Sequence, residues 1–334
     1  MTEQSKIPLP PETPGDASAA RSLIERAAGT FDFRAFQAPL APKLPEVREP
    51  APPIAEGGQP AAPVLRVATP ARPTLAPPAF DGIPARQAFR GTFHPIDRKH
   101  LREQCLIEPE GPVTGLLEEF RIVKRQLLMT AAESRLGRGA PLGERILVCS
   151  AHPGEGKTFC AVNLALSMAA EKDTEVLLVD ADFAKPSVLS ALGLPGGRGL
   201  MDALADPDIA VEDCIICTDG AGLFVLPAGN SSGHDTEHLA SAHTAHVLDR
   251  LTAQAPNRIV IFDSPPVLAA SPASELAHHV GQALMVVRAD QTGEAALRDA
   301  VSILAGCDDI KLLLNCTRFS PTGRRFGSYY GYKE

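Results

Sequence analysis

The sequence predicts an α/β fold with a doubly wound, mostly parallel sheet, and three observations support this prediction. Segments with apolar residues at helical spacing alternate with short apolar runs from about residue 114 to residue 317. Several of these runs are continuous stretches of valine, isoleucine and leucine, which are typical of strands covered by helices on both faces. Polar residues and glycines follow several runs directly, at the carboxyl ends of strands, where such sheets carry their binding sites.

The periodicity predicts each element in turn. Residues 114–135 form the first predicted helix, because Leu116, Phe120, Val123 and Leu127 recur on one side of it. Strands are predicted at residues 145–150, 175–180, 223–227, 258–263, 283–288 and 311–315. Helices are predicted at residues 157–171, 187–192, 236–253, 272–279 and 294–305. Together these elements predict one compact domain over residues 114–317.

Residues 1–110 differ in composition and are predicted to be a long disordered arm. More than half of the 31 prolines lie before residue 100, among alanines and polar residues with few bulky apolar side chains. Such a segment cannot bury enough apolar surface to offset the entropy lost on ordering. Residues 17–36 are the exception, since their apolar spacing predicts a short amphipathic helix. This helix is either transient or a docking peptide for a partner.

Composition excludes several classes of protein. The formal net charge of −8 argues against a nucleic-acid-binding surface, which needs a basic face. No apolar run approaches the ~18 residues needed to span a bilayer, and the N-terminus lacks the pattern of a secretory signal. The seven scattered cysteines are typical of reduced thiols in the cytosol. We therefore expect a cytoplasmic protein.

A phosphate-binding loop is predicted at residues 151–158, which read Ala-His-Pro-Gly-Glu-Gly-Lys-Thr. The loop lies between a predicted strand and a predicted apolar helix, the context that this motif requires. Its glycines allow backbone N–H groups to turn toward phosphate oxygens, Lys157 reaches the β- and γ-phosphates, and Thr158 offers a hydroxyl to Mg²⁺. The candidate nucleotide-binding residues are Pro153, Gly154, Glu155, Gly156, Lys157, Thr158 and Phe159.

Three carboxylates follow predicted strands and are candidate catalytic residues. Asp180 and Asp182 lie two residues apart at the end of one apolar strand, so both side chains point toward the site. An isolated Asp-x-Asp is most often part of a turn, but the apolar strand before it favours a functional role. Asp263 ends another apolar strand, in the arrangement that anchors Mg²⁺ in phosphoryl-transfer enzymes.

The tyrosines have an unusual distribution. All three of them, Tyr329, Tyr330 and Tyr332, lie in the last six residues of the chain. Residues 318–334 are predicted to be a flexible tail, because chain termini are normally mobile and accessible. The tyrosine hydroxyls are therefore candidate acceptors of a phosphoryl group.

These motifs together resemble those of the bacterial tyrosine kinases. The resemblance covers roughly residues 114–334 and implies a P-loop NTPase fold of the SIMIBI (MinD-like) type. It implies that ATP and Mg²⁺ are the cofactors, that Asp180 is the general base, and that Thr158, Asp182 and Asp263 form the metal shell. The resemblance further implies that Lys157 stabilises the transferred group, and that the tail tyrosines are phosphorylated in trans between subunits.

The resemblance extends to assembly and partners. Glu118, Arg121 and Lys124 are similar to the charged motif through which family members form rings. The chain also looks like the soluble variant found in exopolysaccharide loci with an exosortase. It would then be recruited to the inner face of the membrane by a polysaccharide co-polymerase that activates it, and be opposed by a cognate tyrosine phosphatase. Ala184 stands where many relatives have arginine, so one cation near the phosphates is missing.

Two other functions fit parts of the sequence. One is a MinD/ParA-like ATPase of the division and plasmid-partition type, without kinase activity. Those proteins carry a lysine five residues before the loop lysine, where this chain has His152, and they lack a tyrosine tail. The other is a nucleotide-regulated scaffold whose proline-rich arm recruits partners.

Overall fold

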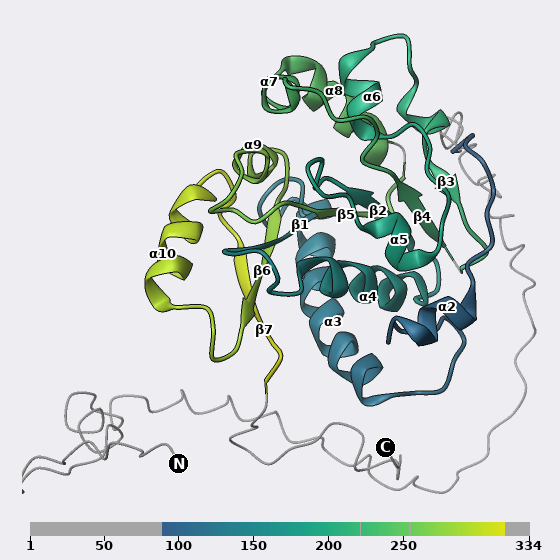
Figure 1. The fold of residues 1–334 in the computed structure, drawn as a ribbon, viewed down its shortest axis with the longest axis vertical. Coiled ribbons are helices and arrows are strands. Elements are labelled where there is room, and N and C mark those ends of the chain that lie inside the picture. The colour runs from purple at the N-terminus through teal and green to yellow at the C-terminus, as the bar shows by residue number, and fades with distance from the viewer. Residues whose placement is uncertain (1–88, 221, 254, 318–334) are drawn as a thin grey trace, which may run out of the picture. The chain divides into compact units, whose positions relative to one another are not determined.

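The computed structural model describes residues 89–220, 222–253 and 255–317. Their core is a seven-stranded sheet with the strand order β3-β4-β2-β5-β1-β6-β7 (Figure 1). The strands are β1 (Arg145–Ser150), β2 (Glu175–Asp180), β3 (Ile216–Cys217), β4 (Leu223–Leu226), β5 (Arg258–Asp263), β6 (Gln282–Arg288) and β7 (Ile310–Asn315). Only the pairing of β3 with β4 is antiparallel among these strands.

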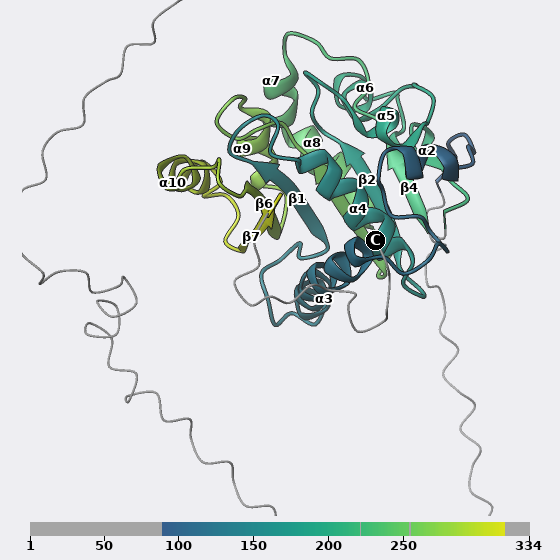
Figure 2. The same ribbon diagram turned by 60° about the horizontal axis from the view of Figure 1, so that its bottom comes forward.

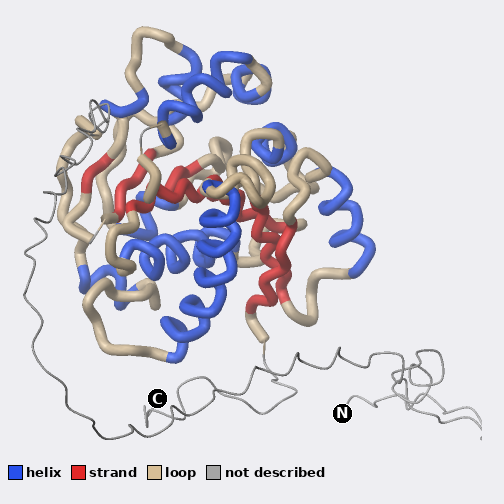
Figure 3. Tube along the Cα trace, turned by 180° about the vertical axis from the view of Figure 1, so that it is seen from behind, coloured by secondary structure: helices blue, strands red, loops and turns tan. Residues whose placement is uncertain are grey.

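Helices cover both faces of the sheet, as the continuous apolar strands predict. The helices are α2 (Arg98–Glu103), α3 (Gly115–Arg135), α4 (Lys157–Ala169), α5 (Val188–Leu192), α6 (Leu200–Ala205), α7 (Asp235–Leu239), α8 (Ala242–Thr252), α9 (Pro272–Ala277) and α10 (Glu294–Ile303). Buried residues of α2 to α5 form one apolar cluster with the sheet, and buried residues of α6 to α10 form a second one. Figures 2 and 3 show the strands between these helical layers.

Alternate strand residues point into the two clusters. In β5, Ile259 and Ile261 belong to the cluster under α3 and α4, whereas Val260 and Phe262 belong to the cluster under α8 and α9. All four side chains are fully buried. The predicted doubly wound architecture is therefore confirmed, and strands β1, β2 and β5 have the predicted bounds.

The folded region begins earlier than the sequence predicts. Residues 89–110, which belong to the predicted disordered arm, pack against the domain as what we call the strap. Leu101 of α2 is fully buried, and the backbone N–H of Ile107 donates to Asn163 Oδ1 of α4 at 2.8 Å. The prediction of disorder over residues 1–110 is thus wrong for residues 89–110. The predicted helix at 17–36 lies outside the described residues.

Two further elements differ from the predictions. The predicted helix at 236–253 is interrupted at Ser241, which caps the start of α8 by accepting from the Thr244 N–H. The Thr244 hydroxyl in turn donates to the carbonyl of His238 at 2.6 Å, and so joins the two short helices. Helices α2 and α6 and strand β3 had no predicted counterpart. No helix in the described ranges is long and apolar enough to cross a membrane.

Candidate functional site

The loop at residues 151–156 joins β1 to α4 and has the backbone conformation of a phosphate cradle. Gly154 and Gly156 have φ angles of 79° and 94°, a region that residues with a Cβ adopt only under strain. Gly156 directly precedes the first turn of α4, so the helix N-terminus faces the loop. The positive end of the helix dipole and the free N–H groups then favour an anion at this position.

Two carboxylates from neighbouring strands meet beside the loop. Asp180 of β2 is paired in register with Asp263 of β5, so both lie at the carboxyl edge of the sheet. The carboxylate of Asp180 accepts from three backbone N–H groups, those of Asp182 at 3.2 Å and of Ser187 and Val188 at 2.9 Å each. Asp180 therefore also shapes the segment that carries Asp182.

Asp182 brings the loop lysine to this edge. Lys157 Nζ lies 2.9 Å from Asp182 Oδ2, and both side chains are largely buried. The other oxygen of Asp182 accepts from the N–H of Lys185 at 3.1 Å. Thr158 shares a hydrogen bond of 3.1 Å with the hydroxyl of Ser187, so the start of α4 is also joined to the segment after β2. The structure thus brings Lys157, Thr158 and all three predicted carboxylates together.

Two of the buried acids have raised pKa values, so a cation bound beside them would stabilise their ionised forms. Burial raises the pKa of Asp263 to about 7, and the nearby Thr158 hydroxyl and Lys157 ammonium offset only part of this effect. Burial likewise raises the pKa of Asp180 to about 6, although its three backbone hydrogen bonds favour the ionised form. Buried, shifted acids of this kind are typical of functional sites.

Asp263 is the most exceptional of the three acids. It is fully buried, and neither carboxylate oxygen has a hydrogen-bond partner of good geometry among the described residues. Buried polar atoms almost always have a partner, so two orphaned oxygens at one residue are typical of a position that binds a cation. With the Thr158 hydroxyl and Asp182 beside it, the donor set consists of oxygen atoms, which Mg²⁺ prefers.

The metal in this arrangement would be shared with a phosphate. The described residues contain no group of three or more His, Cys, Asp or Glu that could hold a metal ion by themselves. Mg²⁺ is usually bound by one or two carboxylates together with substrate phosphates and water, and seldom by protein ligands alone. The residues present therefore fit Mg²⁺ bound together with a nucleotide.

Three contacts to the loop were not predicted from the sequence. Arg288, the last residue of β6, donates to the carbonyl of Gly154 at 2.8 Å, and Thr292 bonds to the carboxylate of Glu155. Asn315, the last residue of β7, donates through its side-chain amide to the carbonyl of Glu155 at 2.9 Å. The sequence signal for two of them is position, since Arg288 and Asn315 each end a predicted strand and are paired with each other at the carboxyl edge of the sheet.

The other predicted loop residues have different environments. Pro153 is exposed, whereas Phe159 is half-buried and packs against the apolar cluster under α3 and α4. The contact of these two residues with nucleotide stays a prediction. Tyr329, Tyr330 and Tyr332 lie outside the described residues.

The three residues of the predicted assembly motif on α3 have two different environments. Glu118 and Arg121 form an ion pair on the surface. Lys124 instead is 4% exposed and donates to the carbonyl of Ser167 at 2.6 Å and to Glu171 at 2.8 Å. Lys124 therefore holds α3 on α4 within the subunit, and the role of the motif at a subunit contact stays a prediction.

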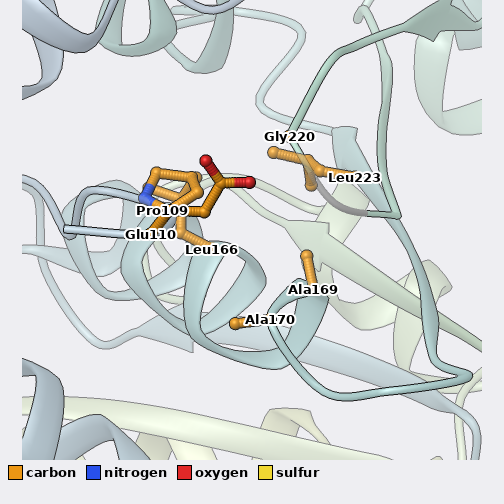
Figure 4. Close-up of a pocket in the computed structure, with 7 residues that line it drawn as sticks. All are labelled: Pro109, Glu110, Leu166, Ala169, Ala170, Gly220 and Leu223. Carbon is orange, nitrogen blue, oxygen red and sulfur yellow. The ribbon is translucent and has the colours of Figure 1, made fainter.

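An apolar pocket lies at the opposite end of α4 and is not a candidate active site. It has a volume of about 230 Å³ and is lined by Pro109, Glu110, Leu166, Ala169, Ala170, Gly220 and Leu223 (Figure 4). Glu110 is its single ionisable lining residue. Its lining residue Leu166 lies nine residues after Lys157 in α4, so about 14 Å of helix separates this pocket from the phosphate loop.

Comparisons with known proteins identify relatives of this chain. No protein-family model matches the sequence. The chain is 28% identical over 219 residues to tyrosine-protein kinase YwqD of Bacillus subtilis, a match that covers 65% of this chain and 87% of the relative. It is 31% identical over 240 residues to tyrosine-protein kinase Wzc of Salmonella typhi, which covers 71% of this chain but only 31% of the relative. The chain thus matches most of one relative and under a third of the other.

Solved structures agree with the sequence relatives. The BceF tyrosine kinase domain has a TM-score of 0.50 and 25% identity, and the match covers 59% of this chain and 76% of that chain. The kinase domain of the Escherichia coli tyrosine kinase ETK has a TM-score of 0.54 at 22% identity, covering 71% of this chain and 92% of that chain, and supports the fold. The chain is therefore a homologue of the bacterial tyrosine-protein kinases, built on the fold of their kinase domains.

Proposed function

We propose that this chain is an ATP-dependent protein-tyrosine autokinase that phosphorylates Tyr329, Tyr330 and Tyr332 of a neighbouring subunit. The observation that carries the proposal is the meeting of Asp180 and Asp263 beside Lys157 at the mouth of a phosphate-binding loop. The curated relatives named tyrosine-protein kinases support the same reaction. Phosphoryl transfer depends mainly on positioning and electrostatic stabilisation, which this set of side chains supplies.

The transfer step assigns a role to each group. The phenolic oxygen attacks the γ-phosphorus of ATP, the bond from that phosphorus to the β,γ-bridging oxygen breaks, and ADP leaves. The phenolic proton passes to Asp180. An ionised carboxylate has about four acceptor positions and three are used by backbone N–H groups, so one remains for the proton.

The remaining groups stabilise charge. Lys157 neutralises charge that develops on the phosphoryl oxygens, at the expense of its contact with Asp182. Bound Mg²⁺ would supply electrostatic stabilisation to the same oxygens, held by Thr158, Asp182 and Asp263. With a pKa of about 6, Asp180 is mostly ionised above neutral pH and can accept the proton.

The length of the C-terminal tail supports transfer between subunits. Residues 316–334 number 19, since 334 − 315 = 19, and could extend about 60 Å at ~3.3 Å per residue. A tail of this length can extend well beyond its own subunit and present the tyrosines to another one. We further propose control of exopolysaccharide synthesis, recruitment to the inner face of the membrane by a co-polymerase activator, and reversal by a tyrosine phosphatase. A relative named a putative tyrosine-protein kinase in a cps region supports this role.

The test is mass spectrometry of the C-terminal peptide after incubation of the purified chain with Mg·ATP. We expect phosphate on the tail tyrosines of the wild type and none in Lys157→Met. A mixture of Lys157→Met with a chain carrying phenylalanine at positions 329, 330 and 332 should phosphorylate the Lys157→Met tail if transfer occurs in trans. ATP hydrolysis without any phosphotyrosine would instead favour a partition-type ATPase.

A further inference from the structure

We propose that a loop brace, defined as Glu155 with Arg288, Thr292 and Asn315, positions the phosphate-binding loop for nucleotide, with Thr292 as its central positioning residue. The inference rests on the nucleotide-binding part of the proposed function and does not depend on kinase activity. Three of the four residues come from the ends of β6 and β7 or the turn after β6, and none of these three belongs to the loop motif.

Glu155 has an internal role in the loop. Its side chain is only 4% exposed although it lies in an otherwise exposed turn. One carboxylate oxygen accepts from the backbone N–H of His152 at 2.9 Å, and the other bonds to the hydroxyl of Thr292. A carboxylate in a loop that binds anions would repel a phosphate, but here both oxygens are engaged by groups of the protein.

Thr292 joins this carboxylate to the end of β6. Its hydroxyl accepts from the backbone N–H of Arg288 at 3.0 Å while it bonds to Glu155. A hydroxyl can donate and accept simultaneously, which serine can also do and valine cannot. The Arg288 guanidinium adds a second connection, since it donates to the Gly154 carbonyl at 2.8 Å.

Asn315 holds the other side of the loop. Its amide donates to the Glu155 carbonyl at 2.9 Å, and a Cβ at Gly156 would lie only 2.3 Å from the Asn315 amide nitrogen. In the brace, Arg288 therefore holds the carbonyl of Gly154 and Asn315 holds the carbonyl of Glu155. With these carbonyls held outward, the intervening N–H groups stay turned toward the phosphate.

A prearranged loop binds more tightly because less conformational freedom is lost on binding. For Thr292→Val we expect the Kd for Mg·ADP to rise about tenfold, which corresponds to ~1.4 kcal/mol. In the kinase assay the KM for ATP should rise similarly while kcat changes less than about twofold, because Thr292 touches no reacting group. Thr292→Ser should restore most of the affinity.

The experiment measures Mg·ADP binding to the full chain by calorimetry, with thermal unfolding as a check on folding. Thr130→Val is the matched control, because the Thr130 hydroxyl on α3 donates to the carbonyl of Gln126 in the same helix and bonds to no other described residue. Wild-type affinity in Thr292→Val, or equal weakening by the serine and valine variants, would overturn the proposal.

A second position keeps the test decisive if Thr292→Val does not fold. Arg288→Met removes the contact with the Gly154 carbonyl at a half-exposed site and should weaken Mg·ADP binding several-fold. Unchanged binding by this folded variant would refute the brace. Because the readout is binding, a wild type that binds Mg·ADP but forms no phosphotyrosine would reject the kinase proposal alone.

Discussion

Asp263 is a residue whose buried charge lowers the stability of the fold but suits a cation-binding site. It is fully buried, neither carboxylate oxygen has a hydrogen-bond partner of good geometry among the described residues, and burial raises its pKa to about 7. A structural carboxylate with this environment would be selected against, because the charge destabilises the folded state. Its presence at the end of β5 is consistent with a site arranged for a cationic ligand.

Replacing Asp263 with asparagine should stabilise the ligand-free protein at high pH. The folded-state pKa lies above the unfolded value near 3.8, so the folded state loses stability as pH rises from about 4 to about 7. We expect a gain on the order of 2–4 kcal/mol at pH 8, which shrinks toward zero near pH 4, together with loss of kinase activity.

Chemical denaturation in EDTA at pH 5 and pH 8 measures this effect. Asp208→Asn, at an exposed position, is the control and should change stability little at either pH. A less stable Asp263→Asn at pH 8 would show that the carboxylate has a stabilising partner.

At the scale of elements, the strap shows how a few apolar side chains extend the domain. Leu101, Leu106 and Ile107 are buried against α4 and α5, although the surrounding sequence has the composition of a linker. Phe89 also packs edge-on to Phe224, with ring centroids 4.9 Å apart. A segment without periodicity is therefore folded by contacts with an existing surface.

Truncating a strap side chain should destabilise the whole domain. Leu101→Ala removes a fully buried side chain, and such changes typically cost about 2–5 kcal/mol. Phe93→Ala changes a side chain that is 63% exposed and should cost less than about 0.5 kcal/mol. Urea denaturation of both variants provides the comparison, and equal stabilities would mean that the strap is not part of the cooperative unit.

Helix α3 carries a second element-scale prediction, which separates stability from assembly. Lys124→Met removes hydrogen bonds to Ser167 and Glu171 and should cost about 1–3 kcal/mol at pH 7. The Lys124 hydrogen bond is the main cause of the lowered pKa of Glu171, so this contribution is present above pH ~4.5 and is lost as pH falls further.

Arg121→Ala, in the exposed pair with Glu118, should change stability by less than about 1 kcal/mol. If the surface part of the motif mediates subunit contacts, this variant should lower the oligomer mass measured by light scattering. An intact oligomer in Arg121→Ala with a dissociated one in Lys124→Met would contradict this division of roles.

Features that a local sequence pattern marks were predicted accurately, whereas contacts that depend on how the strands pair were not. Buried strands β1, β2 and β5 were predicted to the residue, because continuous apolar runs ending in polar residues mark both bounds. The phosphate loop and the three acids Asp180, Asp182 and Asp263 were also predicted from the sequence, because each lies at or just after the end of a continuous apolar run. Thr292 could not be found, because its contact with Glu155 depends on the pairing of β6 beside β1.

At the scale of the whole molecule, charge links phosphorylation to assembly. The chain has a formal net charge of −8, whereas the segment after Asn315 carries Arg318, Arg324, Arg325 and Lys333. A basic tail is attracted to a site that contains Asp180, Asp182 and Asp263. Each phosphotyrosine adds about −1.5 to −2, so three of them add roughly −5 to −6.

Autophosphorylation should therefore loosen the oligomer. The phosphorylated tail is repelled by the acidic site of the next subunit, which removes one contact between them. Light scattering at ~0.1 M salt should give a smaller mass for the phosphorylated chain than for the same chain after phosphatase treatment. Charge screening at 1 M salt, where the Debye length is about 3 Å, should reduce the difference. Equal masses of the two forms at low salt would show that the tail does not contribute to assembly through its charge.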